Sequence, residues 1–178
     1  MPRQARNLPP LDRATLERMA LRYVERFATT RARLERYLRR KIAERGWEGE
    51  AADPAGLADA MVSRGYVDDR AYADAKARSM HGRGLGARRV GDALWAAGVA
   101  EGDRAAVAEE NAPNAAIAAL AFARRRRIGP FAEIPADRPL RDKHLAAMLR
   151  AGHDITLSRQ IVRMAPGEEI DELIAGND

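Results

Sequence analysis

Residues 31–47 read RARLERYLRRKIAERGW, and this stretch decides the class of the fold. Leu34, Leu38 and Ile42 recur every four residues, which places them on one face of a helix. The pattern ends at Gly46-Trp47. Because glycine favours the left-handed conformation that closes a helix, and the apolar residue after it can fold back onto the last turn, the stretch predicts one amphipathic helix of a bundle.

Related endings recur along the chain, each after a helical run of apolar residues. They are Gly65-Tyr66 after Met61, Gly98-Val99 after Val90 and Leu94, and Gly152-His153 after Met148 and Leu149. Small helical units that recur in this way cannot bury an apolar stripe alone and stack against one another. The predicted fold class is therefore all-α, with three tandem three-helix repeats in an elongated, curved right-to-left stack.

Capping residues, glycines and prolines set the expected boundaries. Helices are expected over about 12–28, from Thr30 to Gly46, from Pro54 to Gly65, over 69–80, around Val90 and Leu94, and over 103–110, 113–127, 139–151 and 154–164. These group into a flexible leader (1–11), repeats over 12–67, 68–111 and 112–165, and a frayed acidic tail (166–178).

The composition agrees with a helical core and an intracellular location. Aromatic residues are only 5% of the chain, so the core is expected to consist mainly of aliphatic residues, which favour helices. The chain has no cysteine, which excludes disulfides, thiol catalysis and thiolate metal sites. No apolar stretch is long enough for a signal peptide or a membrane span, so we expect a soluble, cytoplasmic protein.

Positive charge is concentrated in arginine and towards the N-terminus. The net charge is +5, and residues 1–50 hold 13 basic and 7 acidic side chains. Arginine suits bidentate contact with phosphate or carboxylate, so a polyanionic partner is expected. The candidate contact residues are Arg33, Arg36, Arg39 and Arg40 on the face opposite Leu34, Arg88 and Arg89 after a glycine-rich loop, and Arg124, Arg125, Arg126 and Arg127 at a helix end.

Patterns associated with catalysis have simpler structural interpretations. Gly82-x-Gly84-x-x-Ala87 satisfies a relaxed dinucleotide fingerprint, but no strand precedes it. His81, His144 and His153 lack metal-ligand spacing. Asp68 and Asp69 are expected to cap a helix rather than perform acid–base chemistry. We therefore predict no enzyme, no cofactor and no metal site.

The aromatic residues beside the helix ends allow two interpretations. Trp47, Tyr66, Tyr72 and Trp95 are either platforms on which nucleic-acid bases stack or plugs that complete the core. Packing beside glycine favours core plugs, with Gly46, Gly65, Gly98 and Gly152 as the repeat-defining glycines.

Four segments together carry a family resemblance: Arg31–Trp47, Arg64–Ala73 (RGYVDDRAYA), Gly82–Val99 (GRGLGARRVGDALWAAGV) and Leu145–Ile161 (LAAMLRAGHDITLSRQI). From about residue 12 to 164 the chain resembles the RecX regulatory protein family, modulators of the RecA recombinase. The resemblance implies three tandem three-helix repeats forming a curved rod that lies in the groove of RecA filaments on DNA. It also implies restraint of recombinase, ATPase and co-protease activity, without catalysis by the chain itself.

The chain departs from the family pattern at a few positions. Many relatives carry serine near Leu34, Glu-Leu at Tyr37-Leu38, and glycine-phenylalanine at Gly152-His153. The leading hypothesis is a monomeric regulator of RecA in DNA repair, homologous recombination and the SOS response, with single-stranded DNA met directly or through RecA and no membrane contact. The alternative is a helical DNA-binding protein whose arginine faces grip phosphates without RecA.

Overall fold

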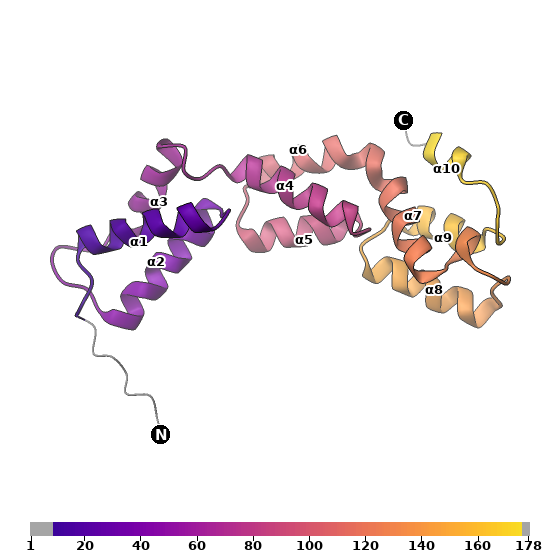
Figure 1. The fold of residues 1–178 in the computed structure, drawn as a ribbon, viewed down its shortest axis with the longest axis horizontal. Coiled ribbons are helices and arrows are strands. Elements are labelled where there is room, and N and C mark those ends of the chain that lie inside the picture. The colour runs from indigo at the N-terminus through magenta and orange to yellow at the C-terminus, as the bar shows by residue number, and fades with distance from the viewer. Residues whose placement is uncertain (1–8, 176–178) are drawn as a thin grey trace, which may run out of the picture. The chain divides into compact units, whose positions relative to one another are not determined.

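A computed structural model of the chain describes residues 9–175, which form α-helices and no named strand (Figure 1). The α-helices are α1 (Arg13–Arg26), α2 (Arg31–Arg45), α3 (Pro54–Ser63), α4 (Asp69–Gly82), α5 (Ala87–Ala97), α6 (Glu101–Asn111), α7 (Ala115–Arg126), α8 (Arg138–Arg150), α9 (Ile155–Arg163) and α10 (Asp171–Ala175). Short 3-10 turns, η1 (Ala112–Asn114) and η2 (Gly129–Phe131), flank α7. The predicted all-α class is confirmed.

The helix ends follow local sequence chemistry. The side chains of Asp12, Thr30, Asp53, Asp137 and Asp154 accept hydrogen bonds from amides in the first turns of α1, α2, α3, α8 and α9. The four repeat-defining glycines have positive φ angles: 81° at Gly46, 75° at Gly65, 78° at Gly98 and 91° at Gly152. The glycine endings and the caps at Asp12, Thr30, Asp53 and Asp154 agree with the helix boundaries expected from the sequence, whereas the cap at Asp137 was not predicted.

The chain divides into two compact units, and we describe each by itself. Unit 1 comprises the residues up to Tyr72 together with Ala97–Val99, and unit 2 comprises Ala73–Ala96 together with the residues from Ala100 onward. This division does not isolate the segment 68–111 that the sequence assigns to a middle repeat. The three-repeat stack therefore stays a prediction.

Unit 1 packs α1, α2 and α3 around one core (Figure 1). Leu16, Leu34, Leu38 and Met61 are buried there, as the helical spacing predicts. Leu11 is also fully buried in this core, and its backbone is held in place because its amide donates to the Gly46 carbonyl oxygen at 3.0 Å and its carbonyl accepts from the Glu48 amide at 2.9 Å. The leader was predicted to reach residue 11, and Leu11 corrects that boundary. Residues 1–8 lie outside the described residues.

The paired aspartates at the start of α4 serve two different helices. The Asp68 carboxylate accepts from the Ala71 amide at 2.8 Å, which caps α4 as predicted. The Asp69 carboxylate instead accepts from the Arg31 amide at 2.7 Å, at the N-terminus of α2. The hydroxyl of Thr30 accepts from the Arg33 amide at 3.2 Å and donates to the Ala97 carbonyl at 2.6 Å. The start of α2 is thus held by contacts from three parts of unit 1.

Unit 2 contains a second core built mainly from α7, α8 and α9. Leu120, Phe122, Ile128, Met148 and Ile161 are among its buried residues. The tail was predicted to be frayed from residue 166, but part of it packs on this core. Ile170 and Leu173 contact the cluster, and the Gly167 amide donates to the Pro130 carbonyl at 2.9 Å. Residues 176–178 lie outside the described residues.

A close backbone crossing joins the start of α5 to the end of α8. The Gly86 amide donates to the Ala151 carbonyl at 2.9 Å, and the Arg88 amide donates to the Gly152 carbonyl at 3.2 Å. A Cβ on Gly86 would collide with Gly152, and a Cβ on Gly152 would lie 2.6 Å from Arg89 Cγ. Both positions therefore require glycine, since a side chain would force the two backbones apart.

Candidate partner-binding surfaces

Acidic neighbours on the same helix engage Arg39 and Arg40 of α2. Arg39 Nη2 lies 2.7 Å from Glu35 Oε1, and Arg40 Nε lies 3.5 Å from Glu44 Oε1. Arg36 is exposed. The α2 arginine face (Arg33, Arg36, Arg39 and Arg40) is therefore a network of ion pairs as well as a basic surface, and its role in binding stays a prediction.

Arg31 is the centre of that network, although the sequence did not single it out. Its guanidinium donates to both Asp59 carboxylate oxygens, at 2.6 and 3.1 Å, and to Glu35 at 2.7 Å. Hydrogen bonds from Arg39 and then Arg31 lower the pKa of Glu35, and the bond from Arg31 lowers the pKa of Asp59. The pair of Arg31 with Asp59 ties α2 to α3, whereas the pairs of Glu35 lie within α2.

Arg33 differs from the rest of the face because it is half-buried against α4. Its Nη1 donates to the Tyr72 hydroxyl at 2.7 Å, and its guanidinium carbon lies 5.4 Å from the centre of the Tyr72 ring. A cation held over an aromatic ring in this way stabilises the fold. Tyr72 thus contributes to packing, as expected for a core plug.

The glycine-rich segment before α5 brings the start of α5 close to the end of α8. Arg88 Nη2 donates to the Leu149 carbonyl at 2.5 Å, and the Arg89 side chain lies against Gly152. Both arginines are nonetheless exposed. The predicted contact residues here also fasten α5 to α8.

The arginine run at the end of α7 is exposed, and each member has a contact within unit 2. Arg124 lies over the Phe131 ring at 4.9 Å, and Arg126 lies over the Phe122 ring at 5.7 Å. Arg125 donates to the Arg83 carbonyl, and Arg127 Nη1 lies 2.6 Å from Glu133 Oε1. Arg127 also closes α7 in the left-handed conformation, with φ 53°. These guanidinium groups would have to exchange such contacts for those of a partner.

Sequence reasoning missed a group of exposed arginines that lies between α8 and α9. Arg138, Arg141, Arg159 and Arg163 line one hollow of about 550 Å³, hereafter the α8–α9 hollow. Arg141 Nη1 donates to the Ala136 carbonyl at 3.3 Å. Over residues 9–175, we find no side-chain hydrogen bond or ion pair for the other three.

Two aromatic residues predicted as core plugs are exposed. Tyr66 keeps 53% and Trp95 keeps 69% of its surface accessible, so the prediction was wrong for both. Trp47 is half-buried beside the core of unit 1, and its indole nitrogen donates to the Glu50 carbonyl. For Trp47, the prediction of packing next to Gly46 is confirmed.

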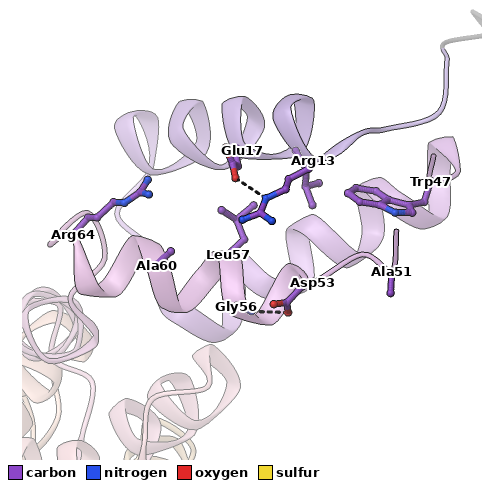
Figure 2. A pocket seen from close by; sticks show the side chains of 10 residues that line it. Arg13, Glu17, Trp47, Ala51, Asp53, Gly56, Leu57, Ala60 and Arg64 are labelled. Atoms are coloured by element: carbon purple, nitrogen blue, oxygen red, sulfur yellow. Dashed lines mark hydrogen bonds and ion pairs between the residues drawn. The ribbon is translucent and has the colours of Figure 1, made fainter. Parts of the chain in front are cut away.

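Unit 1 has its own hollow, of about 220 Å³, beside the Trp47 ring (Figure 2). Of its charged side chains, Arg13, Glu17 and Asp53 are already engaged. Arg13 Nε lies 3.2 Å from Glu17 Oε1 on α1, and Asp53 accepts from the Gly56 amide at 2.8 Å to cap α3. The arrangement brings no nucleophile and base together.

His153 behaves as a structural residue. His153 is buried, its Nε2 lies 3.1 Å from the Gly84 carbonyl oxygen, and burial lowers its pKa. Its ring lies 5.4 Å from that of Phe122, so it fills the predicted position of the aromatic after the repeat glycine. Within the described part of the chain, no three acidic or histidine side chains form a group suited to a metal ion. No helix there is long and apolar enough to cross a membrane.

No family model matches the chain, but comparison with curated proteins finds relatives over most of its length. The chain is 33% identical over 174 residues to the regulatory protein RecX of Myxococcus xanthus (strain DK1622), covering 93% of this chain and 91% of that protein. It is 28% identical over 158 residues to the regulatory protein RecX of Agrobacterium fabrum (strain C58), covering 86% and 85% of the two chains.

Two crystal structures share the fold. RecX from Lactobacillus salivarius aligns with a TM-score of 0.62 at 15% identity, covering 84% of this chain and 93% of that one. A second structure, described as regulatory protein RecX, aligns with a TM-score of 0.60 at 21% identity, covering 83% and 70%. At these identities the likeness supports the helical fold alone.

Proposed function

The chain belongs to the RecX family of regulatory proteins, and from this premise we propose that it binds RecA filaments on single-stranded DNA and restrains their activity. The observation that carries the proposal is the 33% identity to a regulatory RecX protein across 93% of the chain. The activities restrained are strand exchange, ATP hydrolysis and co-protease function in recombination and the SOS response.

The proposed action is binding rather than catalysis. Arginines on α2 in unit 1, and on α7, α8 and α9 in unit 2, suit contact with a polyanionic filament, because arginine bonds phosphate and carboxylate bidentately. We infer that one monomer in the cytoplasm bridges neighbouring RecA protomers and hinders filament growth. No cofactor is needed for this action.

Titration of the purified chain into RecA with single-stranded DNA and ATP tests the proposal. We expect ATP hydrolysis and strand exchange to fall as the chain approaches the concentration of RecA, and filaments to shorten in electron micrographs. Unchanged rates and filament lengths at equal concentrations would reject the proposal.

A second candidate is direct DNA binding that needs no RecA. It is favoured by the exposure of Arg36, Arg39 and Arg40 along α2. Its signature is an affinity for DNA alone that falls steeply with salt and is abolished when Arg33, Arg36 and Arg40 are replaced by alanine. If binding to DNA requires RecA, the first candidate stands and the second is excluded.

A further inference from the structure

The α8–α9 hollow is an open positive surface of unit 2. Four arginines and one aspartate, Asp142, line it, giving a net charge of +3. Leu145 and Val162 contribute its apolar part. A hollow with this charge is expected to attract a polyanion, since attraction grows with the local density of like charges.

Helix geometry places the four guanidinium groups together. Arg138 and Arg141 are three residues apart on α8, while Arg159 and Arg163 are four apart on α9, so each pair lies on one face of its helix. The two helices pack against each other through buried residues that include Met148 and Ile161 (Figure 1). The arginines therefore stand on rigid elements with little main-chain entropy left to lose on binding.

Unlike Arg31, Arg39 and Arg40 of α2, the four arginines of the hollow form no ion pair with a carboxylate within residues 9–175. Asp142 is the acidic residue in the lining, and Asp137 is occupied as the cap that accepts from the Leu140 amide at 2.9 Å. Apart from the bond from Arg141 to the Ala136 carbonyl, we find no side-chain partner for the four arginines within residues 9–175. A ligand here would not need to displace an ion pair.

We propose that the α8–α9 hollow binds consecutive phosphates of single-stranded nucleic acid. The proposal goes beyond the proposed regulation of RecA, because it assigns a direct DNA contact to one site of the chain. Guanidinium groups match phosphate oxygens bidentately, and a phosphodiester chain presents one charge per nucleotide whatever its sequence. A protein partner would have to order several flexible carboxylate side chains to supply the same charge, at a cost in entropy.

The residues that line the hollow also predict whether binding depends on the nucleotide sequence. No aromatic side chain lines the hollow, so stacking on bases does not contribute there. Contact with phosphates alone carries no sequence information. Binding at this site is therefore expected to be independent of sequence and strongly dependent on salt.

Fluorescence anisotropy with a labelled 20-nucleotide oligo(dT) and the full chain tests the site. The double variant Arg159→Gln/Arg163→Gln is expected to bind about tenfold more weakly at 50 mM salt, since two phosphates are no longer neutralised. The slope of log affinity against log salt is expected to flatten by about 1.4, because each phosphate neutralised on a single strand contributes about 0.7. Because both arginines are exposed, the fold is expected to persist, which circular dichroism would check.

The matched control is Arg39→Gln/Arg40→Gln, which removes the same charge from α2. Those guanidinium groups already contact Glu35 and Glu44, so a smaller decrease in affinity is expected. Equal decreases in oligo(dT) affinity for the two double variants, or no decrease for either, would contradict the proposal that the α8–α9 hollow binds nucleic acid. Tighter binding of poly-glutamate than of oligo(dT) at equal charge would also overturn it, in favour of an acidic protein partner.

Measuring RecA inhibition beside DNA binding separates this site from the proposed function. If the unaltered chain has no effect on RecA while oligo(dT) binding depends on Arg159 and Arg163, the regulatory proposal fails and the site stands. If RecA is inhibited but the double variant binds oligo(dT) as well as the unaltered chain, the site fails and the regulatory proposal stands.

Discussion

The arginines of α2 and those of the α8–α9 hollow have the same chemistry but different surroundings. On α2, Glu35 lies four residues from both Arg31 and Arg39 and pairs with both. In the α8–α9 hollow, Asp142 lies four residues after Arg138, yet no ion pair joins the two among residues 9–175, and Ile155, four residues before Arg159, carries no charge. Positive charge is thus partly used for folding in the first region and is available to a partner in the second.

Arginine content alone is therefore a poor guide to the location of a binding surface. Residues 1–50 hold the largest excess of positive charge, yet several of their guanidinium groups have carboxylate partners. Exposed ion pairs of this kind add little stability each, but they reduce the charge that a distant phosphate experiences. The ion pairs that acidic residues actually form indicate which arginines are available to a partner better than a count of arginines does.

The largest expected effect comes from a substitution that disturbs the turn between α8 and α9, which positions the arginines of the hollow. Gly152→Ala is expected to destabilise unit 2 by about 2–4 kcal/mol, because a side chain at φ 91° is strained and would overlap Arg89. Oligo(dT) binding is expected to fall with it. Gly82→Ala is the control, since a Cβ there meets open space. Equal urea midpoints for both variants would contradict the prediction.

The next largest effect tests whether the contacts at the start of α2 stabilise the fold. Thr30→Val removes the hydroxyl that caps α2 and bonds the Ala97 carbonyl, at a site with no exposed surface. A decrease of about 1–3 kcal/mol in the free energy of unfolding is expected in urea. Thr29→Val is the control, because the Thr29 hydroxyl has only a 3.5 Å contact with the Thr30 carbonyl. DNA affinity of the folded variant is expected to stay within about twofold.

Much of the fold could be predicted from the sequence because its signals are local. Caps such as Asp12 and Asp154 and terminators such as Gly46 act within one turn of the residues that they organise. Leu11 was misassigned because its partners, the backbone groups of Gly46 and Glu48, lie more than thirty residues away. Trp95 was misassigned because position beside a glycine indicates a helix end but not the side on which the core lies.

The candidate site was less predictable for the same reason. Arg159 and Arg163 lie about 20 residues from Arg138 and Arg141, and only the packing of α8 on α9 brings them to one hollow. The contact of Arg33 with Tyr72 is equally non-local. In contrast, the pairing of Glu35 with Arg31 and Arg39 could have been predicted from four-residue spacing, had acidic positions been weighed beside basic ones.

Acidification is expected to remove the internal pairs of α2 and so weaken unit 1. The pKa of Glu35 lies below its ordinary value of 4.5, because its charged form is bonded by Arg39 and Arg31 in the folded state. A lowered pKa contributes stability that is complete above 4.5 and is lost as the pH falls through the lowered value. Trp47 fluorescence in a Trp95→Phe background would measure unfolding between pH 7 and 3, and a midpoint independent of pH would contradict the expectation.

Replacing Glu35 at neutral pH should release the guanidinium groups of Arg31 and Arg39 from their ion pairs, so that α2 attracts phosphate more strongly. Glu35→Gln removes the ionic partner of Arg31 and Arg39, at a cost of no more than about 1 kcal/mol in stability. Oligo(dT) affinity is expected to rise about threefold, as for one added phosphate contact. Glu25→Gln makes the same change of charge on α1 at an exposed position, and an equal rise there would show that net charge alone is responsible.

The smallest effect concerns acidic residues at the edge of the α8–α9 hollow. Arg163 lines a second hollow together with Glu168 and Glu169, so their charges reduce the attraction of Arg163 for phosphate. Glu168→Gln/Glu169→Gln is expected to raise oligo(dT) affinity about two- to threefold at 50 mM salt. The gain should vanish near 1 M salt, where the screening length is about 3 Å.

Two comparisons decide whether the gain acts through Arg163. Glu48→Gln/Glu50→Gln removes the same charge from exposed positions in unit 1 and should change affinity less. In an Arg163→Gln background, the gain from Glu168→Gln/Glu169→Gln should largely disappear, because the arginine that these carboxylates oppose is gone. A gain that persists without Arg163 would mean that the acidic residues act on the whole chain, and the local contrast between the two arginine regions would then lose its strongest support.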